Sequence, residues 1–521
     1  MKSYYSRALD YPNNARKRCL TILLSVILVF FFFLVFTYSS AVAQEATEWS
    51  SFEHVPGYSD DAFPPFLIAD QNKTVHAFSS QQIGSDQFQA AVFYRQWTLA
   101  GDWTNPVDII LPPAGEVKIL SAFLDQSGKI HLIYQATDQG VVKIYYSWGP
   151  ATNAARATSW SSPIAVGESA ISPSSGSIAG DEDGNLTIIY NGNRDGNGVY
   201  AIYSSDAGLT WSEPQPIFLT LDGSLIPFSL QLSRGREEQL HGTWNVVSSL
   251  GVDEFLYYMR QDIASQVWTG PILLDERVEG EGYFGPSFPA IVDNGEKSVI
   301  MYNGGSQARA GSVDVGRPVQ RVQESFDNGE SWSDAIEPFP LLQGRSGSHA
   351  LAVDSNGIIH ALFIQRIDRS IDGQFEPIGG MWHSELVDQR WGEPERVVMG
   401  RSGHDLSVVV SQGNTLLVTM REDPGVGNSG VWSSYKKLDV PELPLLDVPT
   451  LESVPVAAAT RPLAEAVPTL IASNEAVNSV PVAVSEGENN ATTLLFMGLA
   501  PVFIILAAVI LLHRFIQSYR R

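Results

Sequence analysis

A pattern of two short apolar strands joined by a tight polar turn recurs seven times in this chain of 521 residues. Its period of about 50 to 60 residues is typical of propellers, in which each repeat forms one small antiparallel sheet. The second strand of the pattern sometimes carries His and often ends in an aromatic residue. The copies begin near Phe66, Phe123, Ile178, Leu230, Ala290, Leu351 and Val408. The period therefore predicts one repeat fold over most of the chain.

A Trp residue opens each predicted fourth strand, and these residues indicate how many blades there are. They are Trp49, Trp103, Trp160, Trp211, Trp268, Trp332 and Trp391. Trp49 precedes the first repeat, whereas the last repeat ends at its third strand near Tyr435. We therefore predict that the strand around Trp49 completes the last blade, which closes the ring and removes exposed sheet edges. The predicted fold class is all-β, a seven-bladed β-propeller, with six blades as the alternative.

Two connections between third and fourth strands match the pattern S-x-D-x-G-x-[S/T]-W. Their defining residues are Ser204, Asp206, Gly208 and Trp211 in one, and Ser325, Asp327, Gly329 and Trp332 in the other. The Asp can accept hydrogen bonds from the turn, the Gly permits a positive φ, and the Trp packs between sheets. These turns resemble the Asp boxes (BNR repeats) of the sialidase, or neuraminidase, superfamily. The resemblance covers residues 45–437 and implies a sialidase-like propeller in which the Asp box is a structural turn.

The resemblance also implies what a hydrolysing member should contain. Such members are expected to have three arginines that hold the substrate carboxylate, a Tyr nucleophile assisted by Glu, and an Asp acid/base. Their first arginine lies in an R-I-P motif at the start of the first blade, but the corresponding stretch here, residues 60–66, contains no Arg. This departure favours a glycan- or ligand-binding protein without catalytic activity. An exo-sialidase or related glycoside hydrolase or lyase, and a protein-interaction scaffold, stay open as alternatives.

The predicted strand order places the second-to-third-strand loops and the links between blades on one face, where the funnel of a sialidase-like propeller opens. Basic side chains there could bind an anionic sugar, because guanidinium grips a carboxylate in bidentate fashion. Bracing of neighbouring blades through hydrogen bonds to loop carbonyls is the structural alternative. The substrate-binding candidates are Arg345, His349, Arg366, Arg401, His404 and Arg421, and the catalytic candidates are Glu279, Glu281 and Tyr283.

The charge balance and the histidine spacing exclude other classes. With 57 acidic and 33 basic residues the formal net charge is −24, and phosphate binding needs a basic stripe, so no nucleic-acid partner is predicted. No pair among the nine His has the spacing of a zinc motif, and acidic turns such as Asp181–Gly184 lack the full EF-hand pattern. The sequence therefore predicts no metal and no cofactor.

Two apolar runs predict the topology. The run from Cys19 to Phe36 follows basic residues 16–18 and precedes Ala41-Val42-Ala43, which indicates a signal peptide or an uncleaved N-terminal anchor. The uncharged run 491–512 is long enough to span a bilayer and precedes Arg514. The positive-inside rule then places the propeller on the extracytoplasmic side of the cell membrane. The predicted segments are a signal or anchor (1–43), the propeller (45–437), a disordered Pro/Val/Ala/Glu-rich stalk (438–490), a transmembrane helix (491–513) and a cytoplasmic tail (514–521). The predicted partners are the membrane and, through the propeller, glycans or glycoconjugates.

Overall fold

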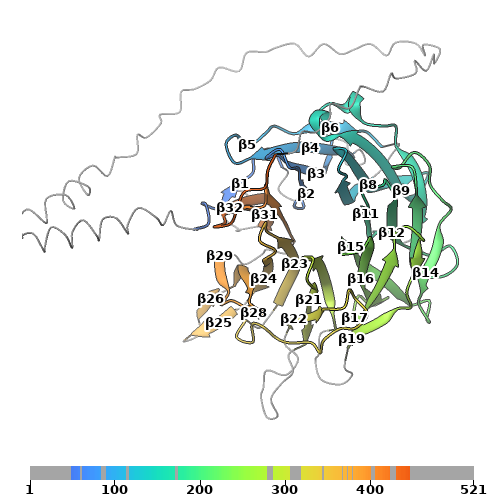
Figure 1. The fold of residues 1–521 in the computed structure, drawn as a ribbon. Helices are drawn as coiled ribbons and strands as arrows, with labels where there is room; N and C mark the ends of the chain where they lie inside the picture. Colours follow the sequence, from blue (N-terminus) through green and yellow to red (C-terminus); the bar gives the residue numbers. More distant parts are fainter. Residues whose placement is uncertain are drawn as a thin grey trace, which may run out of the picture. The chain divides into compact units, whose positions relative to one another are not determined.

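The chain divides into two compact units, residues 1–454 and 455–521. The computed structural model describes residues 48–58, 62–83, 90–112, 116–169, 174–277, 285–305, 318–342, 345–366, 368–371, 374–377, 379–399, 405–422 and 430–445. All of them belong to the first unit, where seven antiparallel sheets follow one another in a ring (Figure 1). The seven-bladed prediction is confirmed, and the six-bladed alternative is wrong.

The first four blades are built from consecutive strands. Blade 1 comprises β2 (Phe66–Ala69), β3 (Val75–Gln82), β4 (Ala90–Thr98), β5 (Asp102–Trp103) and β6 (Val107–Ile110). Blade 2 comprises β7 (Val117–Leu124), β8 (Lys129–Asp138), β9 (Val141–Pro150) and β10 (Ile164–Ser169), with the short 3-10 helices η1 (Ala151–Asn153) and η2 (Ala157–Ser159) before its last strand. Blade 3 comprises β11 (Gly176–Gly180), β12 (Leu186–Gly192), β13 (Gly198–Ser204) and β14 (Gln215–Leu219). Blade 4 comprises β15 (Leu225–Arg234), β16 (Gln239–Ser248), β17 (Asp253–Asp262), β18 (Val267–Trp268) and β19 (Ile272–Glu276).

The last three blades vary this plan. Blade 5 comprises β20 (Ser287–Asp293), β21 (Ser298–Gly305) and β22 (Pro318–Ser325), and a single bridge from Val322 to Ile336 stands in place of its fourth strand. Blade 6 comprises β23 (Arg345–Val353), β24 (Ile359–Arg366), β27 (Gly380–Val387), β28 (Arg390–Trp391) and β29 (Glu395–Met399), with a separate hairpin of β25 (Asp368–Ile371) and β26 (Gln374–Pro377). Blade 7 comprises β30 (Leu406–Ser411), β31 (Thr415–Glu422), β32 (Gly430–Lys437) and the N-terminal strand β1 (Glu53–His54).

The N-terminal segment closes the ring. Glu53 and His54 lie opposite Ser433 and Trp432 in the antiparallel pair of β1 and β32. Backbone hydrogen bonds of 2.8 Å, one of them from Ser50 N to the Tyr435 carbonyl, continue the pairing on both sides of β1. The prediction that the strand around Trp49 completes the last blade is confirmed. Closure pairs an edge of β32 that would otherwise be open to another chain.

Aromatic contacts between neighbouring blades fill the gaps between sheets. Trp211 of blade 3 packs edge-on against Tyr146 of blade 2, with ring centroids 4.8 Å apart. Trp332 makes the same contact with Tyr258 of blade 4 at 4.8 Å. The Trp residues before the fourth strands therefore pack between sheets, as the sequence predicts, and contribute apolar burial where two blades meet.

The two S-x-D-x-G-x-[S/T]-W turns have the hydrogen bonds that their residue types predict. Asp327 Oδ1 accepts hydrogen bonds from the Ser331 backbone N–H at 2.9 Å and from the Ser325 hydroxyl at 2.8 Å. Gly329 has a φ of 82°, and its N–H donates to Ser325 Oγ at 2.8 Å. The first turn repeats this geometry around Asp206. Each carboxylate thus holds its own turn together.

The structure describes the first residues of the predicted stalk, 438–445. Leu438 is buried in the apolar cluster shared by blades 6 and 7, and the Ser355 hydroxyl and the Gln412 side chain donate hydrogen bonds to the carbonyls of Pro441 and Leu443. Residues 438–445 therefore pack against the propeller. No helix in the part of the chain that the structure describes is long and apolar enough to cross a membrane. The predicted signal or anchor and the predicted transmembrane helix lie outside the described residues.

Candidate functional site

The innermost strands of the blades begin on one side of the ring, which we call the entry rim. It consists of the first residues of the innermost strands β2, β7, β11, β15, β20, β23 and β30, the described residues just before these strands, and the loops between second and third strands. Beta-bulges interrupt the strand pairing near these first residues in blades 2, 4, 5 and 6. Bulges re-aim side chains and are frequent beside binding sites. The face that the sequence predicts to carry function is therefore irregular where a ligand would approach it.

Two of these bulges hold a residue other than glycine at positive φ. Ser229 in blade 4 and Phe288 in blade 5 both have a φ of 50°. Phe288 is also 39% exposed. A bulky residue in this conformation is strained, and strain of this kind is concentrated at functional sites. The backbone of blade 5 thus presents an aromatic ring to solvent at the entry rim.

Lys118, in the innermost strand of blade 2, places its own ammonium group at the entry rim. Its side chain is exposed, yet its ammonium lies 5.7 Å from the centroid of the Phe228 ring of blade 4 and 3.3 Å from the Ser174 carbonyl oxygen. The surrounding wall displaces water and lowers the pKa of Lys118, while the charge of Asp405 in front of blade 7 raises it. A charged amine and an aromatic face therefore meet over the inner edge of blade 3.

A second cation and aromatic ring lie where blade 7 meets the start of blade 1. The guanidinium of Arg421 lies 5.3 Å from the centroid of the Phe63 ring, which is 63% exposed. The Arg421 backbone N–H donates to the Asp405 carbonyl at 3.2 Å. Phe63 belongs to the stretch in which hydrolysing sialidases are expected to carry their first arginine. Asp405 thus connects the two cation–aromatic pairs, Lys118–Phe228 and Arg421–Phe63.

Asp253, at the start of β17, carries the most displaced carboxyl pKa of the entry rim. Burial raises the pKa of Asp253 to about 7, a hydrogen bond from Asn245 opposes the rise, and repulsion from Glu254 adds to it. The Asn245 Nδ2 donor lies 2.5 Å from Asp253 Oδ1, and Asn245 lies opposite Phe228 in the strand register. A carboxyl with such a pKa can take or give a proton near neutral pH.

Apart from Arg421, the residues that the sequence predicts for substrate binding or catalysis divide into three groups. Arg345 and Arg366 lie opposite each other at the entry-rim end of blade 6, and their side chains are outside what the structure describes. His349 is buried, with Nδ1 3.2 Å from the Phe288 carbonyl oxygen. Burial lowers its pKa to about 4, so it is neutral at pH 7 and braces blade 6 against blade 5. Glu279, Glu281, Tyr283, Arg401 and His404 lie outside the described residues.

Amide side chains of the second strands also brace the entry rim. Gln135 Oε1 accepts a hydrogen bond from the Ser174 N–H at 2.6 Å, which ties blade 2 to the entry of blade 3. Asn303 Nδ2 donates to the Gly347 carbonyl at 2.9 Å and ties blade 5 to blade 6. These buried polar groups thus brace neighbouring blades, whereas Lys118 is exposed and Arg421 is half-buried. A lone Lys inside an apolar innermost strand is the signal by which the sequence could have revealed Lys118.

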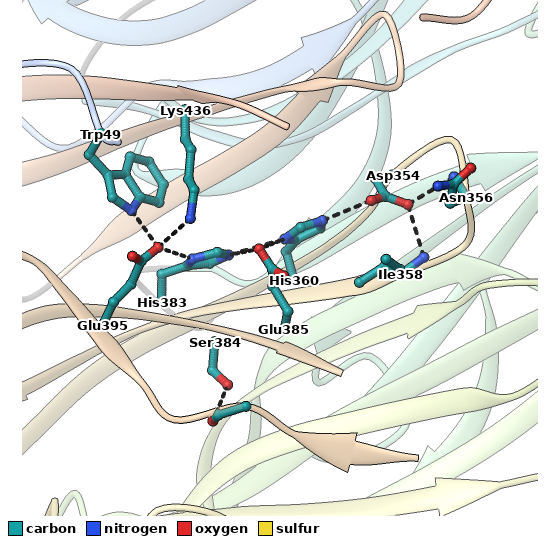
Figure 2. A network of polar contacts seen from close by, with 11 residues as sticks. Trp49, Asp354, Asn356, Ile358, His360, His383, Ser384, Glu385, Glu395 and Lys436 are labelled. Atoms are coloured by element: carbon teal, nitrogen blue, oxygen red, sulfur yellow. Dashed lines mark hydrogen bonds and ion pairs between the residues drawn. The ribbon is translucent and has the colours of Figure 1, made fainter. Parts of the chain in front are cut away.

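A polar network around the buried His360 and His383 joins blades 6 and 7 near the hairpin that connects β23 to β24 (Figure 2). His360 Nδ1 lies 3.0 Å from His383 Nε2, and His383 Nδ1 lies 2.7 Å from Glu395 Oε1. Burial alone would raise the pKa of Glu395, but hydrogen bonds from His383, Lys436 and Trp49 outweigh it and hold the pKa at about 2. The network therefore ends in an ionised carboxylate.

No family model matches the chain, and no curated protein matches it significantly. One similar solved structure is the PL25 ulvan lyase, a polysaccharide lyase, bound to -[GlcA(1-4)Rha3S]-. Its sequence is 13% identical, the match covers 72% of this chain and 94% of the lyase, and the TM-score is 0.48. The Hadza microbial sialidase Hz136 is 13% identical over 67% of this chain and 74% of its own, with a TM-score of 0.37. The NanB sialidase from Streptococcus pneumoniae is 12% identical over 77% and 71%, with a TM-score of 0.39. Sialidases are thus among the similar structures, as the resemblance predicts, and the likeness concerns the fold alone.

Proposed function

We propose that this propeller binds an anionic glycan at its entry rim. The observation that carries the proposal is the ammonium of Lys118, an exposed residue, 5.7 Å from the centroid of the Phe228 ring. An aromatic ring offers a large apolar face, which suits the C–H face of a sugar. A neighbouring cation makes charge-assisted hydrogen bonds with a carboxylate or sulfate group. The two groups together match the two parts of an acidic sugar.

The pair of Arg421 and Phe63 extends this surface toward blade 1. Guanidinium is the side-chain group that best matches the planar geometry of a carboxylate, and Phe63 leaves most of its ring open to solvent. Two separate cation–aromatic pairs suit an oligosaccharide that carries more than one acidic unit. The exposed Phe288 adds a third ring at the same rim.

Calorimetric titration of the full chain with neutral, carboxylated and sulfated oligosaccharides tests this proposal. We expect binding of acidic chains only, with Lys118→Met and Arg421→Met each weakening it about tenfold to a hundredfold, because a charge-assisted hydrogen bond contributes ~1.5–3 kcal/mol. Lys129→Met is the matched control, since its ammonium lies 4.4 Å from the Trp148 ring near the opposite hairpins. The proposal would be overturned if neutral oligosaccharides bound as tightly as acidic ones, or if all three variants lost affinity equally.

Glycan cleavage is the second candidate function, and the displaced pKa of Asp253 favours it. A carboxyl that titrates at about 7 is suited to general acid or base catalysis. Asp253 accepts a hydrogen bond from Asn245, and Asn245 lies opposite Phe228 in the strand register. Asp253 therefore lies beside the proposed binding surface. Release of new reducing ends from the acidic chains, abolished in Asp253→Asn while binding persists, would support an enzyme. Binding without release would leave the protein a non-catalytic receptor.

We also propose that a membrane anchor holds the propeller outside the cell membrane, and this part of the proposal rests on the sequence alone. The uncharged run 491–512 and the basic residues around Arg514 support an anchor that leaves the propeller outside. Truncation of residues 491–521 should release the propeller from the membrane fraction, whereas the full chain should remain there and be accessible to added protease. Recovery of the full chain in the soluble fraction would refute the anchor.

A further inference from the structure

Blade 6 departs from an arrangement that blades 1, 2 and 4 share. In those blades a buried His of the second strand contacts a Tyr hydroxyl of the third strand through Nδ1. The pairs are His76–Tyr94 at 2.7 Å, His131–Tyr146 at 2.7 Å and His241–Tyr258 at 2.6 Å. In each blade the Tyr lies opposite the residue two positions after the His. In blade 6 the His is His360, and the Tyr position, opposite Leu362, is occupied by His383.

A carboxylate joins the two histidines of blade 6. Glu385 lies opposite His360 in the register and two residues after His383, so all three side chains lie on one face of the sheet. Glu385 Oε1 is 3.7 Å from His360 Nδ1 and 3.9 Å from His383 Nε2 (Figure 2). The positions that correspond to Glu385 in blades 1, 2 and 4 carry Gln96, Trp148 and Arg260. Among the described residues of these four blades, only those of blade 6 bring together three side chains of the types His, Cys, Asp and Glu.

The three ligand atoms have the spacing of a first coordination shell. They form a triangle with sides of 3.0, 3.7 and 3.9 Å. A single point in its plane lies about 2.1 Å from all three atoms, and zinc is bound at roughly 2.0–2.1 Å by imidazole and roughly 2.0–2.2 Å by carboxylate. A four-coordinate ion lies slightly out of this plane, so small shifts of the side chains bring all three atoms to these bond lengths.

Outer carboxylates hold both imidazoles in this orientation. His360 Nε2 faces Asp354 Oδ2 at 3.3 Å, and Asp354 is itself fixed by hairpin N–H groups, one of them from Ile358 at 2.9 Å. His383 Nδ1 faces Glu395 Oε1 at 2.7 Å. A carboxylate on the far nitrogen of each ring is the usual support of a metal-bound histidine, because it fixes the tautomer and the ring orientation.

The count of ring protons also favours a cation between the rings. Each neutral imidazole has one N–H. When both rings donate to their outer carboxylates, Asp354 and Glu395, the lone pairs of His360 Nδ1 and His383 Nε2 face each other at 3.0 Å beside the Glu385 carboxylate. Such an arrangement is repulsive unless a positive charge lies between the groups. A metal ion supplies that charge, and a proton shared by the two rings is the competing arrangement.

We propose that His360, His383 and Glu385 form a binding site for a zinc-type divalent ion, distinct from the glycan-binding rim. Two imidazoles and one carboxylate are a ligand set that suits zinc, and three protein ligands leave a fourth position for water. The side chains of both histidines are 2% exposed and that of Glu385 is 36% exposed, so the fourth position lies on the Glu385 side.

Titration of the chelator-treated full chain with Zn²⁺ alone, and with Co²⁺ alone, tests the site. We expect about one ion per chain and, with Co²⁺, the visible absorption of a four-coordinate centre. His383→Tyr recreates the His–Tyr pair of blades 1, 2 and 4, so it should fold and lose binding at least a hundredfold. Glu385→Gln, on the exposed side, should weaken binding about tenfold or more even if His383→Tyr does not fold.

His54→Gln, in β1 and outside the cluster, controls for metal held by surface imidazoles and should bind as the natural chain does. Failure of the natural chain to take up about one ion, or equal uptake by His383→Tyr or Glu385→Gln, would overturn the site and leave the shared proton as the arrangement. Neither result bears on the glycan proposal, whose residues lie at the entry rim.

Discussion

Trp49 Nε1 donates a hydrogen bond to Glu395 Oε1 at 2.9 Å, joining two residues 346 positions apart in the chain. The indole ring of Trp49 also packs edge-on against His383, with ring centroids 5.4 Å apart. The residue that precedes the closing strand therefore contacts blade 6 twice (Figure 2). Closure of the ring and the position of the buried histidine pair depend on the same side chain.

Replacement of Trp49 by Phe should lower the free energy of unfolding in two ways, because it shrinks the aromatic ring and removes the hydrogen bond to Glu395. The lost hydrogen bond should contribute about 1 kcal/mol of this decrease. Trp211→Phe is the matched control. Trp211 makes the same edge-on contact, with Tyr146, but its Nε1 is buried without a hydrogen-bond partner among the described residues. Denaturant unfolding of the full chain measures both variants. Equal losses would show that the hydrogen bond contributes nothing to closure.

Gly329→Ala should destabilise the protein by several kcal/mol, because a Cβ there would lie 1.7 Å from Tyr258 Oη, in addition to the strain of a φ of 82°. Gly295→Ala isolates the strain, since Gly295 has a φ of 85° and no atom within 4 Å of its Cβ position. Strain alone costs ~1–2 kcal/mol. Thermal unfolding should rank the two variants clearly. A similar fall in both would mean that Tyr258 moves aside without cost.

Asp327→Ala should matter less as the pH falls. Hydrogen bonds from the Ser331 side chain and backbone lower the pKa of Asp327 to about 2. A lowered folded-state pKa contributes stability above the ordinary carboxyl pKa of about 4, and this stability is lost as the pH falls through about 2. The difference from the natural chain should therefore shrink between about pH 4 and pH 2, from at most about 1 kcal/mol in this exposed turn. A difference that stays constant over this pH range would show that the hydrogen bonds do not favour the ionised carboxylate of Asp327.

The sequence predicts the blades well because blade formation depends on local pattern. The two S-x-D-x-G-x-[S/T]-W turns form their hydrogen bonds within a few residues, each Trp marks the start of a fourth strand, and Trp49 without a preceding repeat already indicates closure. The entry rim is harder to predict, because Lys118 and Phe228 meet only when blades 2 and 4 enter one ring. The histidine cluster requires a strand register that places His383 where other blades have Tyr, and no local spacing encodes that.

Asp253→Asn should raise stability near neutral pH. Burial raises the pKa of Asp253 to about 7, so between about pH 4 and pH 7 the folded chain holds a proton that the unfolded chain has released. Stability therefore falls as the pH rises through this window, and the variant lacks this fall. Asn245 Nδ2 can still donate to the new amide oxygen, as it does to Asp253 Oδ1 at 2.5 Å. Denaturant unfolding at about pH 4, 5.5 and 7 should show the natural chain losing stability relative to Asp253→Asn as the pH rises. A constant difference across these values would mean that Asp253 is ionised throughout, and it would remove the reason to regard this carboxyl as a proton donor.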